Sequence, residues 1–423
     1  MKYLLCLCLL LAALCAVTRC CPEDICREVN NTNLKDGREN LLTYSCDKKG
    51  SNYADFVFRF YKQASSKEAD KNVFFSPMSI STAFAMLAVG AKSTTLSQIF
   101  EGLGFDNVTE TRVHDVHESF HKVLSVLNCA DVNITLNIGN ALFTATGYEP
   151  QELFLQNIKE FYDADFFSSD FHKPEEAKKQ INIYVEEKTK GKIPELVGDL
   201  DPSTVLVLVN YIYFKAAWEK SFDPLRTFED DFFVNTNVSV RVNMMQRDGT
   251  SNIYYDHDLS CVVVELPYQG TARALFILPD EGKMKQVEDA LSKETVCKWD
   301  SRFDYHQTNL RLNLQLPKFS ISGSYDVKTL FEQMGITEVF SGDADLSGIS
   351  GNRDLQVSQA IHKALLEVDE AGTEAAGATA IILTRLSSIS RTIKFNKPFL
   401  ILISDKQTGT TLFMGKIVDP TQE

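Results

Sequence analysis

Residues 370–386 read EAGTEAAGATAIILTRL and connect a strand-like run at 361–369 to an apolar run that contains residues 395–404. This connection is long, because most links between elements in compact domains have about 4–6 residues. Residues 373–380 are small, free of proline and carry one charge, on Glu374. Read with period two, one face is free of charge and carries Thr373, Ala375, Gly377, Thr379, Ile381 and Leu383. We therefore predict a segment that can be an exposed loop and can also enter a sheet as a buried strand.

The segment resembles the reactive-centre loop of the serpins, a family in which loop insertion into a sheet is a known device. Six stretches, in the family's order, resemble serpin signatures from about residue 51 to the C-terminus. They are NVFFSPMSISTAFAMLAVGA (72–91), LVNYIYFKAAWEKSF (208–222), ALFILPDEGKM (274–284), HKALLEVDEAGTEAAGA (362–378), FNKPFLILI (395–403) and LFMGKIVDPT (412–421). Within the family, the chain is most similar to the secreted group of alpha-1-antitrypsin and antichymotrypsin.

The fold class expected from the pattern is α+β. Residues 205–216 are apolar almost throughout and predict a central strand, 310–316 alternate and predict a one-sided strand, and 175–189 predict an amphipathic helix. These elements mingle without a regular βαβ repeat. The length of 423 residues alone would predict two or three domains. The resemblance instead implies one serpin domain over 51–423, with several helices around three β-sheets and an exposed reactive-centre loop at about 370–393.

The ends and the charge indicate an exported protein. Residues 1–20 are typical of a secretory signal peptide, with Lys2 before a short apolar run at 4–16. No later run of about 18 apolar residues predicts a membrane span. The formal net charge of −14 argues against binding to nucleic acid and other polyanions. Residues 111–127 hold only the basic residues Arg112 and Lys122, so we do not expect heparin binding. We expect a secreted, extracellular monomer.

The cysteines and sequons are consistent with export. Four Asn-x-Ser/Thr sequons predict N-glycosylation at Asn30, Asn107, Asn133 and Asn237. Residues 21–50 form a polar N-terminal extension in which cysteines cluster, whereas the cysteines of the domain are dispersed. The extension carries Cys21, Cys26 and Cys46, and the domain carries Cys129, Cys261 and Cys297. We expect a local disulfide in the extension and buried free thiols in the domain; the alternative is an intermolecular disulfide through an unpaired extension cysteine.

No catalytic set is present, so we expect neither an enzyme nor a cofactor. The sequence has no Gly-x-Ser-x-Gly elbow, no His-Glu-x-x-His helix and no recognisable Cys-His pair. His114, His117 and His121 share a possible helix face that could bind a metal. A solvated helix face is the favoured interpretation, and we predict no metal site.

The resemblance implies roles for three groups of residues. A polar cluster called the shutter lies beneath the point where the main sheet opens, and comprises Ser76, Ser79, Asn210 and His362. Trp218 marks the breach, where the loop starts to enter; it is equally well interpreted as simple core. The hinge of the loop comprises Glu370, Gly372, Thr373, Glu374, Ala375, Ala376, Gly377, Ala378 and Thr379.

The function implied is inhibition of serine proteases by a suicide-substrate mechanism. The protease cleaves the loop, remains attached as an acyl-enzyme, and is trapped when the loop inserts into the main sheet. The family count places the residue before the scissile bond sixteen after Glu370, at Leu386, with Ser387 following. Leu386 suits the apolar pocket of a chymotrypsin-like protease, whereas cleavage between Arg385 and Leu386 would suit a trypsin-like protease. The alternative function is a non-inhibitory carrier of thyroxine or corticosteroids on the same fold.

Overall fold

The computed structural model describes residues 42, 46, 53–67, 70–105, 109–128, 134–305, 309–372 and 391–422. Several predicted features lie outside these residues. They are the signal peptide at 1–20, most of the extension at 21–50, the sequons at Asn30, Asn107 and Asn133, the hinge from Thr373 through Glu374, Ala375, Ala376, Gly377 and Ala378 to Thr379, and the candidate reactive bonds at Arg385, Leu386 and Ser387.

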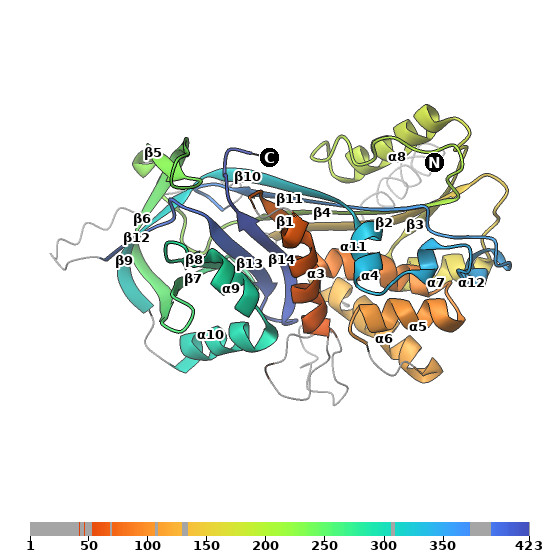
Figure 1. Ribbon diagram of the computed structural model, residues 1–423, viewed down its shortest axis with the longest axis horizontal. Helices are drawn as coiled ribbons and strands as arrows, with labels where there is room; N and C mark the ends of the chain where they lie inside the picture. Colours follow the sequence, from red (N-terminus) through yellow and green to blue (C-terminus); the bar gives the residue numbers. More distant parts are fainter. Residues whose placement is uncertain are drawn as a thin grey trace, which may run out of the picture.

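A five-stranded sheet spans the middle of the molecule (Figure 1). Its strands, in spatial order, are β10 (Phe319–Asp326), β11 (Gln359–Val368), β4 (Leu206–Ala216), β2 (Ile134–Ala145) and β3 (Asp165–Ser169). β11 and β4 are parallel neighbours, whereas β10 is antiparallel to β11 and β2 is antiparallel to β4. β4 lies in the centre of the sheet, as its apolar sequence predicted.

The other strands of the described chain form a nine-stranded network. Its order is β1 (Val73–Phe75), β14 (Thr410–Ile417), β13 (Phe399–Asp405), β8 (Ala272–Pro279), β7 (Cys261–Pro267), β6 (Ser239–Asp256), β9 (Asn309–Pro317) and β12 (Arg391–Lys394), with β5 (Phe228–Phe233) also paired to β6. The long strand β6 pairs with β5 at its start, with β9 over its middle and with β7 at its end. It thus joins two portions of the network, which together with the five-stranded sheet give the expected three-sheet fold.

Helices cover both faces of the five-stranded sheet, with α8 on one face and α4 to α7 on the other (Figure 1). The helices are α3 (Tyr53–Lys67), α4 (Pro77–Ala88), α5 (Ser93–Gly102), α6 (Glu110–Asn128), α7 (Glu152–Tyr162), α8 (Pro174–Lys188), α9 (Met284–Ala290), α10 (Lys293–Tyr305), α11 (Val327–Gln333) and α12 (Ser347–Ser350), with short 3₁₀ turns η1 (Pro224–Arg226) and η2 (Glu338–Phe340). Among the helices of the described residues, none has the length and apolarity needed to cross a membrane.

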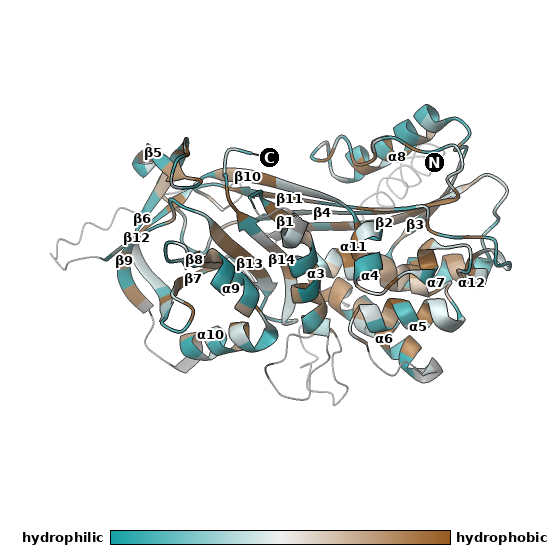
Figure 2. Cartoon of the chain, viewed as in Figure 1, coloured by the Kyte–Doolittle hydropathy of each residue, from teal (hydrophilic) through white to brown (hydrophobic). Residues whose placement is uncertain are grey.

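The alternation of β4 explains why both faces need a cover. Leu206, Leu208, Ile212 and Phe214 belong to the main core on the α4 side, whereas Val207, Val209 and Tyr211 belong to a smaller core with Ile181 and Val185 of α8. Successive side chains of a strand point to opposite faces, so a run that is apolar at most positions on both faces requires apolar contacts on both sides. In Figure 2 the outer helix α8 is mainly hydrophilic, whereas the interior strand β13 is hydrophobic.

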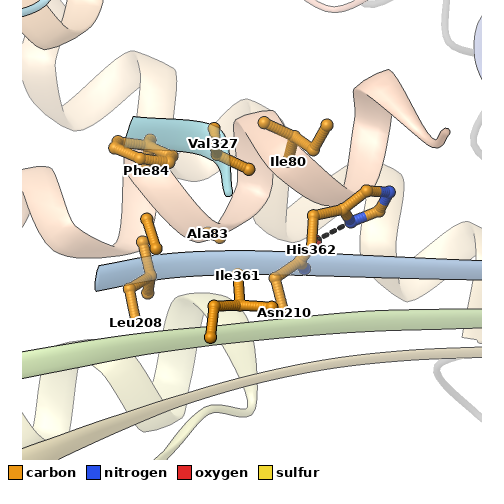
Figure 3. A pocket seen from close by; sticks show the side chains of 9 residues that line it. Ile80, Ala83, Phe84, Leu208, Asn210, Val327, Ile361 and His362 are labelled. Atoms are coloured by element: carbon orange, nitrogen blue, oxygen red, sulfur yellow. Dashed lines mark hydrogen bonds between the residues drawn. The ribbon is translucent and has the colours of Figure 1, made fainter. Parts of the chain in front are cut away.

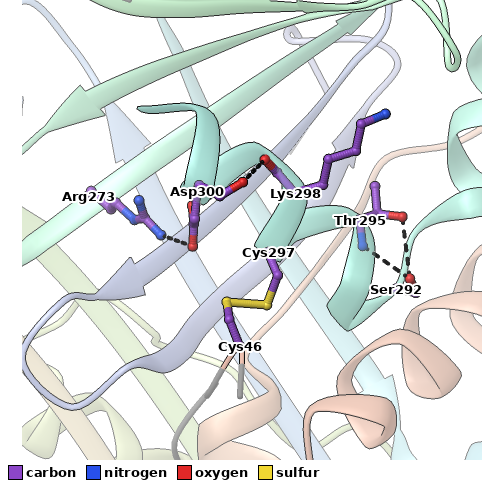
Figure 4. The surroundings of a disulfide bond; sticks show 8 residues. Cys46, Arg273, Ser292, Thr295, Cys297, Lys298 and Asp300 are labelled. Atoms are coloured by element: carbon purple, nitrogen blue, oxygen red, sulfur yellow. Dashed lines mark hydrogen bonds and ion pairs between the residues drawn. A yellow bond between two sulfur atoms is a disulfide. The ribbon is translucent and has the colours of Figure 1, made fainter. Parts of the chain in front are cut away.

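The predicted cysteine arrangement is wrong in one respect. Cys46 of the extension is bonded to Cys297 on α10, 251 residues further along the chain (Figure 4). Cys297 is therefore not a free thiol, and Cys46 is not available for a local bond with Cys21 or Cys26, which lie outside the described residues. The physical reason is that Leu42 is buried in the main core, which brings the end of the extension against the domain. Cys261 is buried and free, as predicted, whereas Cys129 lies outside the described residues.

Candidate functional site

The boundary between β4 and β11, which we call the seam, is the candidate site. Over the seam, Gln359 lies opposite Val207 and the pairing continues in parallel to Leu366 opposite Phe214. The chain leaves β11 after Val368, so a segment that turned back into the seam would run antiparallel to both neighbours. One parallel ladder would then be replaced by two antiparallel ladders. Because parallel pairing is slightly less stable per residue, the seam is a position where the sheet can gain from an additional strand.

A buried polar cluster crosses the seam. His362 of β11 lies directly opposite Asn210 of β4, and the His362 Nδ1 atom is 2.5 Å from Asn210 Oδ1 (Figure 3). The backbone N–H of Ser76 donates to His362 Nε2 at 3.1 Å. The Asn210 amide donates to Ser79 Oγ at 2.7 Å and to Asn140 Oδ1 at 2.7 Å. These contacts join both seam strands to β2 and to the start of α4, so separating β4 from β11 breaks the bond between His362 and Asn210.

The start of α4 explains how Ser76 and Ser79 reach the cluster. Ser76 is the N-cap of α4, and its Oγ accepts a hydrogen bond from Ser79 N at 3.1 Å. Pro77 follows at the first helical position, where its missing N–H is not needed. Ser76 and Ser79 are both fully buried beneath the sheet. The cap therefore directs one backbone N–H and one hydroxyl towards the seam.

Hydrogen bonding and burial fix the charge of His362. Its Nε2 atom accepts from Ser76, so Nδ1 carries the proton and donates to Asn210. Complete burial lowers the pKa of His362 to about 3, because the charged ring would lose its hydration. A second ring proton would also point at the Ser76 N–H. The ring is therefore neutral at physiological pH, and the cluster carries no charge.

A small cavity lies beside the cluster, between the seam and the helices beneath it (Figure 3). It is lined mainly by apolar side chains, from Ile80, Ala83 and Phe84 of α4, Val327 of α11, and Leu208, Ala360 and Ile361 of the seam strands, with Asn210 and His362 at one side. A void removes dispersion contacts from the side chains that line it. The packing that holds β4 and β11 closed is therefore incomplete at this point.

Trp218 holds the first residues after β11. Its indole Nε1 donates to the carbonyl of Asp369 at 3.0 Å, and its backbone N–H donates to the carbonyl of Ala371 at 3.0 Å. The indole is buried and stacks on Tyr268 at a ring-centroid distance of 4.2 Å. Gly372 has φ +111°, and a Cβ atom there would lie 2.3 Å from the Trp218 backbone nitrogen. Trp218 thus has both a core contact and a contact with the start of the loop.

Glu370 forms a second attachment at this end of the seam. Its carboxylate accepts a hydrogen bond from Thr227 Oγ1 at 2.8 Å and pairs with Lys318 Nζ at 3.0 Å. Its carbonyl accepts a hydrogen bond from Phe222 N at 2.8 Å. Burial alone would raise the pKa of Glu370, but the bonds from Thr227 and Lys318 outweigh that effect and hold the pKa below its usual value. The loop must release these contacts before residue 370 can move into the seam.

The structure thus brings the described site residues into two groups. Ser76, Ser79, Asn210 and His362 meet beneath the middle of the seam, and Trp218, Glu370 and Gly372 meet at the end of β11. Sequence reasoning missed Asn140, Thr227 and Lys318. Asn140 is one of several polar residues in β2, so its polarity did not single it out. Nothing local marks Thr227 or Lys318 as partners of Glu370.

The sequence pattern had indicated that the histidines of α6 share one solvated face. That prediction is wrong for His117. His114 is exposed, but His117 is buried, and its Nδ1 lies 2.5 Å from the Tyr162 hydroxyl of α7. The reason is that α6 packs on α7 along this row, where His121 also contacts Phe161. Burial lowers the pKa of His117 to about 4. In the part of the chain that the structure describes, no group of three His, Cys, Asp or Glu side chains is placed to hold a metal ion.

Comparison with known sequences points to one protein family. A family model described as "Serpin (serine protease inhibitor)" matches residues 51–420. The chain is 44% identical over 420 residues to alpha-1-antiproteinase 2 of Equus caballus, covering 99% of this chain and 98% of that protein. It is 43% identical over 423 residues to alpha-1-antichymotrypsin of Homo sapiens, covering 99% and 98% respectively.

Two solved structures are similar to this chain over most of its length. Human glycosylated kallistatin is similar with a TM-score of 0.83 and 42% identity, covering 88% of this chain and 98% of that chain. Human thyroxine-binding globulin in complex with its hormone is similar with a TM-score of 0.82 and 40% identity, again covering 88% and 98%.

Proposed function

The chain belongs to the serpin family, and we propose that it is a secreted inhibitor of serine proteases that acts by cleavage and insertion of its own loop. Relatives at 43–44% identity over nearly the whole chain are named antiproteinase and antichymotrypsin. The observation that carries the proposal is the seam, a parallel strand pair whose β11 member continues directly into the small, charge-poor segment at 373–380. We assign the inhibitory domain to residues 51–423.

The chemistry belongs to the target protease. Its serine oxygen attacks the carbonyl carbon before the scissile bond, the C–N bond breaks, and the released amine takes a proton from the protease's general acid. The protease is then held as an ester on the newly formed carboxyl end of the loop. Residues 373–386 enter the seam as an antiparallel strand and carry the protease with them. The inhibitor itself contributes no catalytic residue, in agreement with a family of inhibitors.

The seam residues have distinct tasks in this mechanism. The shutter residues Ser76, Ser79, Asn210 and His362 exchange hydrogen-bond partners as β4 and β11 separate, because hydroxyl, amide and imidazole groups can each donate and accept. The contacts of Trp218 and Glu370 hold the loop start until cleavage frees it. The uncleaved form is then protected by a barrier, so its stability is kinetic.

Two adjacent bonds are candidates for cleavage. Leu386–Ser387 suits a chymotrypsin-like protease, and Arg385–Leu386 suits a trypsin-like protease. The test is to incubate the protein with chymotrypsin and with trypsin, and to look for a detergent-resistant complex by electrophoresis. The mass of the released C-terminal fragment identifies the bond. A fragment that begins at Ser387 assigns Leu386, whereas cleavage without any stable complex would contradict inhibition.

A carrier function is the second candidate, favoured by the similarity to thyroxine-binding globulin. It predicts tight binding of thyroxine or a corticosteroid and no stable complex with either protease. Equilibrium dialysis with both hormones, on the same preparation used for the protease assay, separates the two functions.

The remaining assignments concern export. We propose that residues 1–20 direct secretion, and that Asn237, which is exposed between β5 and β6, is an N-glycosylation site together with Asn30, Asn107 and Asn133. We further propose that the protein is a monomer. We also propose that it acts without heparin, because Arg112 and Lys122 are the only Lys or Arg residues in 111–127.

A further inference from the structure

The hairpin formed by β5 and β6 exposes apolar side chains at its tip. Phe233 is 49% exposed and Val238 is 48% exposed. Only seven large hydrophobic side chains are exposed among the described residues, and two of them lie in this one turn. An exposed apolar pair at one place is a candidate contact surface.

Phe233 is held outward by its neighbours. Phe232 is fully buried and its ring lies 6.3 Å from that of Phe399. Because successive side chains of a strand point to opposite faces, burial of Phe232 directs Phe233 to solvent. The backbone N–H of Phe233 donates to the carbonyl of Asn396 at 2.8 Å. The ring is therefore presented on a fixed backbone.

The sequon Asn237-Val238-Ser239 occupies the same turn. Ser239 lies directly opposite Phe233 in the hairpin register. Asn237 is exposed, and its backbone N–H donates to Asn235 Oδ1 at 2.9 Å, which orders the turn. Residues 234–240 read VNTNVSV and carry no charge. A bare, uncharged strand end with β-branched residues is a site of unwanted pairing between molecules.

We propose that the first N-acetylglucosamine of a glycan on Asn237 packs on Phe233, which lies opposite Ser239 of the same sequon, and covers this tip. One face of a pyranose ring presents C–H groups, which match the apolar face of an aromatic ring. The attached glycan would then shield the uncharged edge from other chains. The inference rests on the proposed secretion and glycosylation, and it is independent of protease inhibition.

The test uses protein from a mammalian secretory expression system and measures amide hydrogen exchange of residues 235–240 by mass spectrometry. Four proteins are compared: wild type, Ser239→Ala, Phe233→Ala and the double variant. Loss of the glycan through Ser239→Ala should speed exchange about 2- to 10-fold when Phe233 is present, and should have little effect when it is absent. Trimming the wild-type glycan to a single N-acetylglucosamine should preserve the protection.

Phe228→Ala is the matched control, because Phe228 is an exposed phenylalanine at the other end of β5, opposite Met244. The glycan effect should be unchanged in that background. An unoccupied Asn237 in the wild-type protein would overturn the inference, as would an equal effect of Ser239→Ala with and without Phe233. The readout does not depend on inhibition of a target protease, so failure of the proposed inhibition would leave it intact.

Discussion

Replacement of His362 by glutamine should remove most of the acid sensitivity of the seam. The neutral imidazole accepts from Ser76 and donates to Asn210. A glutamine amide offers a carbonyl acceptor and N–H donors in place of the two ring nitrogens but does not titrate. The variant therefore keeps a neutral cluster that can be satisfied, and removes only the proton equilibrium of the ring.

The magnitude follows from the shifted pKa. In the closed seam the pKa of His362 is about 3, against an ordinary value of 6.5. A lowered histidine pKa means that the open state binds the proton more tightly, so the closed state is fully stable above pH 6.5 and loses stability as pH falls towards 3. If opening exposes the ring fully, the closed seam loses about 2 kcal/mol between pH 7 and pH 5, which is about a 25-fold change in the opening equilibrium.

The assay is uptake of a labelled peptide with the sequence of residues 373–386, measured at pH 7 and pH 5. Uptake by the wild type should accelerate at pH 5 by up to about 25-fold, and the acceleration should be largely absent in His362→Gln. His117→Gln is the matched control, since His117 is a buried histidine with a pKa of about 4 that lies on α6, where it contacts Tyr162 of α7. It should reduce the acid sensitivity of global unfolding but leave that of peptide uptake unchanged. Equal acceleration in wild type and His362→Gln would refute the reasoning.

Three further changes have defined outcomes. Cys46→Ser opens a loop of 251 residues to Cys297 and should lower the free energy of unfolding by up to about 5 kcal/mol; an unchanged denaturant midpoint would contradict this. Glu370→Gln removes the ion pair with Lys318 and should speed peptide uptake a few-fold, which corresponds to about 0.5–1 kcal/mol. High salt should speed uptake by the wild type, because it screens this ion pair, and should leave uptake by the variant unchanged. Thr373→Arg places a charge where the loop must be buried, at a cost of several kcal/mol, so the protease should cleave the variant at the normal rate without a stable complex; retention of the complex on a denaturing gel would count against loop burial.

Periodicity was sufficient to predict a central strand, a one-sided strand and an amphipathic helix. The apolar run at 205–216 became β4, the alternating run at 310–316 lies within β9, and the predicted helix at 175–189 corresponds to α8. In each of these segments the sequence pattern itself reports which faces are buried. The resemblance to serpins then pointed to Ser76, Ser79, Asn210 and His362, which the fold brings within hydrogen-bonding distance of one another.

What the sequence did not reveal depends on contacts between distant segments. Cys46 and Cys297 are 251 residues apart, and no local pattern relates them. His117 is buried because α7 packs on this part of α6, although His117 is only one helical turn from the exposed His114. Glu370 is paired with Lys318, which lies between β9 and β10, 52 residues earlier in the chain. These features become visible only once the chain is folded.

The structure of the loop-cleaved protein tests the central claim most directly. The account predicts that residues 373–386 form a strand between β4 and β11, antiparallel to both, with His362 no longer opposite Asn210. A cleaved protein in which Gln359 to Leu366 remain paired with Val207 to Phe214, as they are in the uncleaved chain, would contradict it.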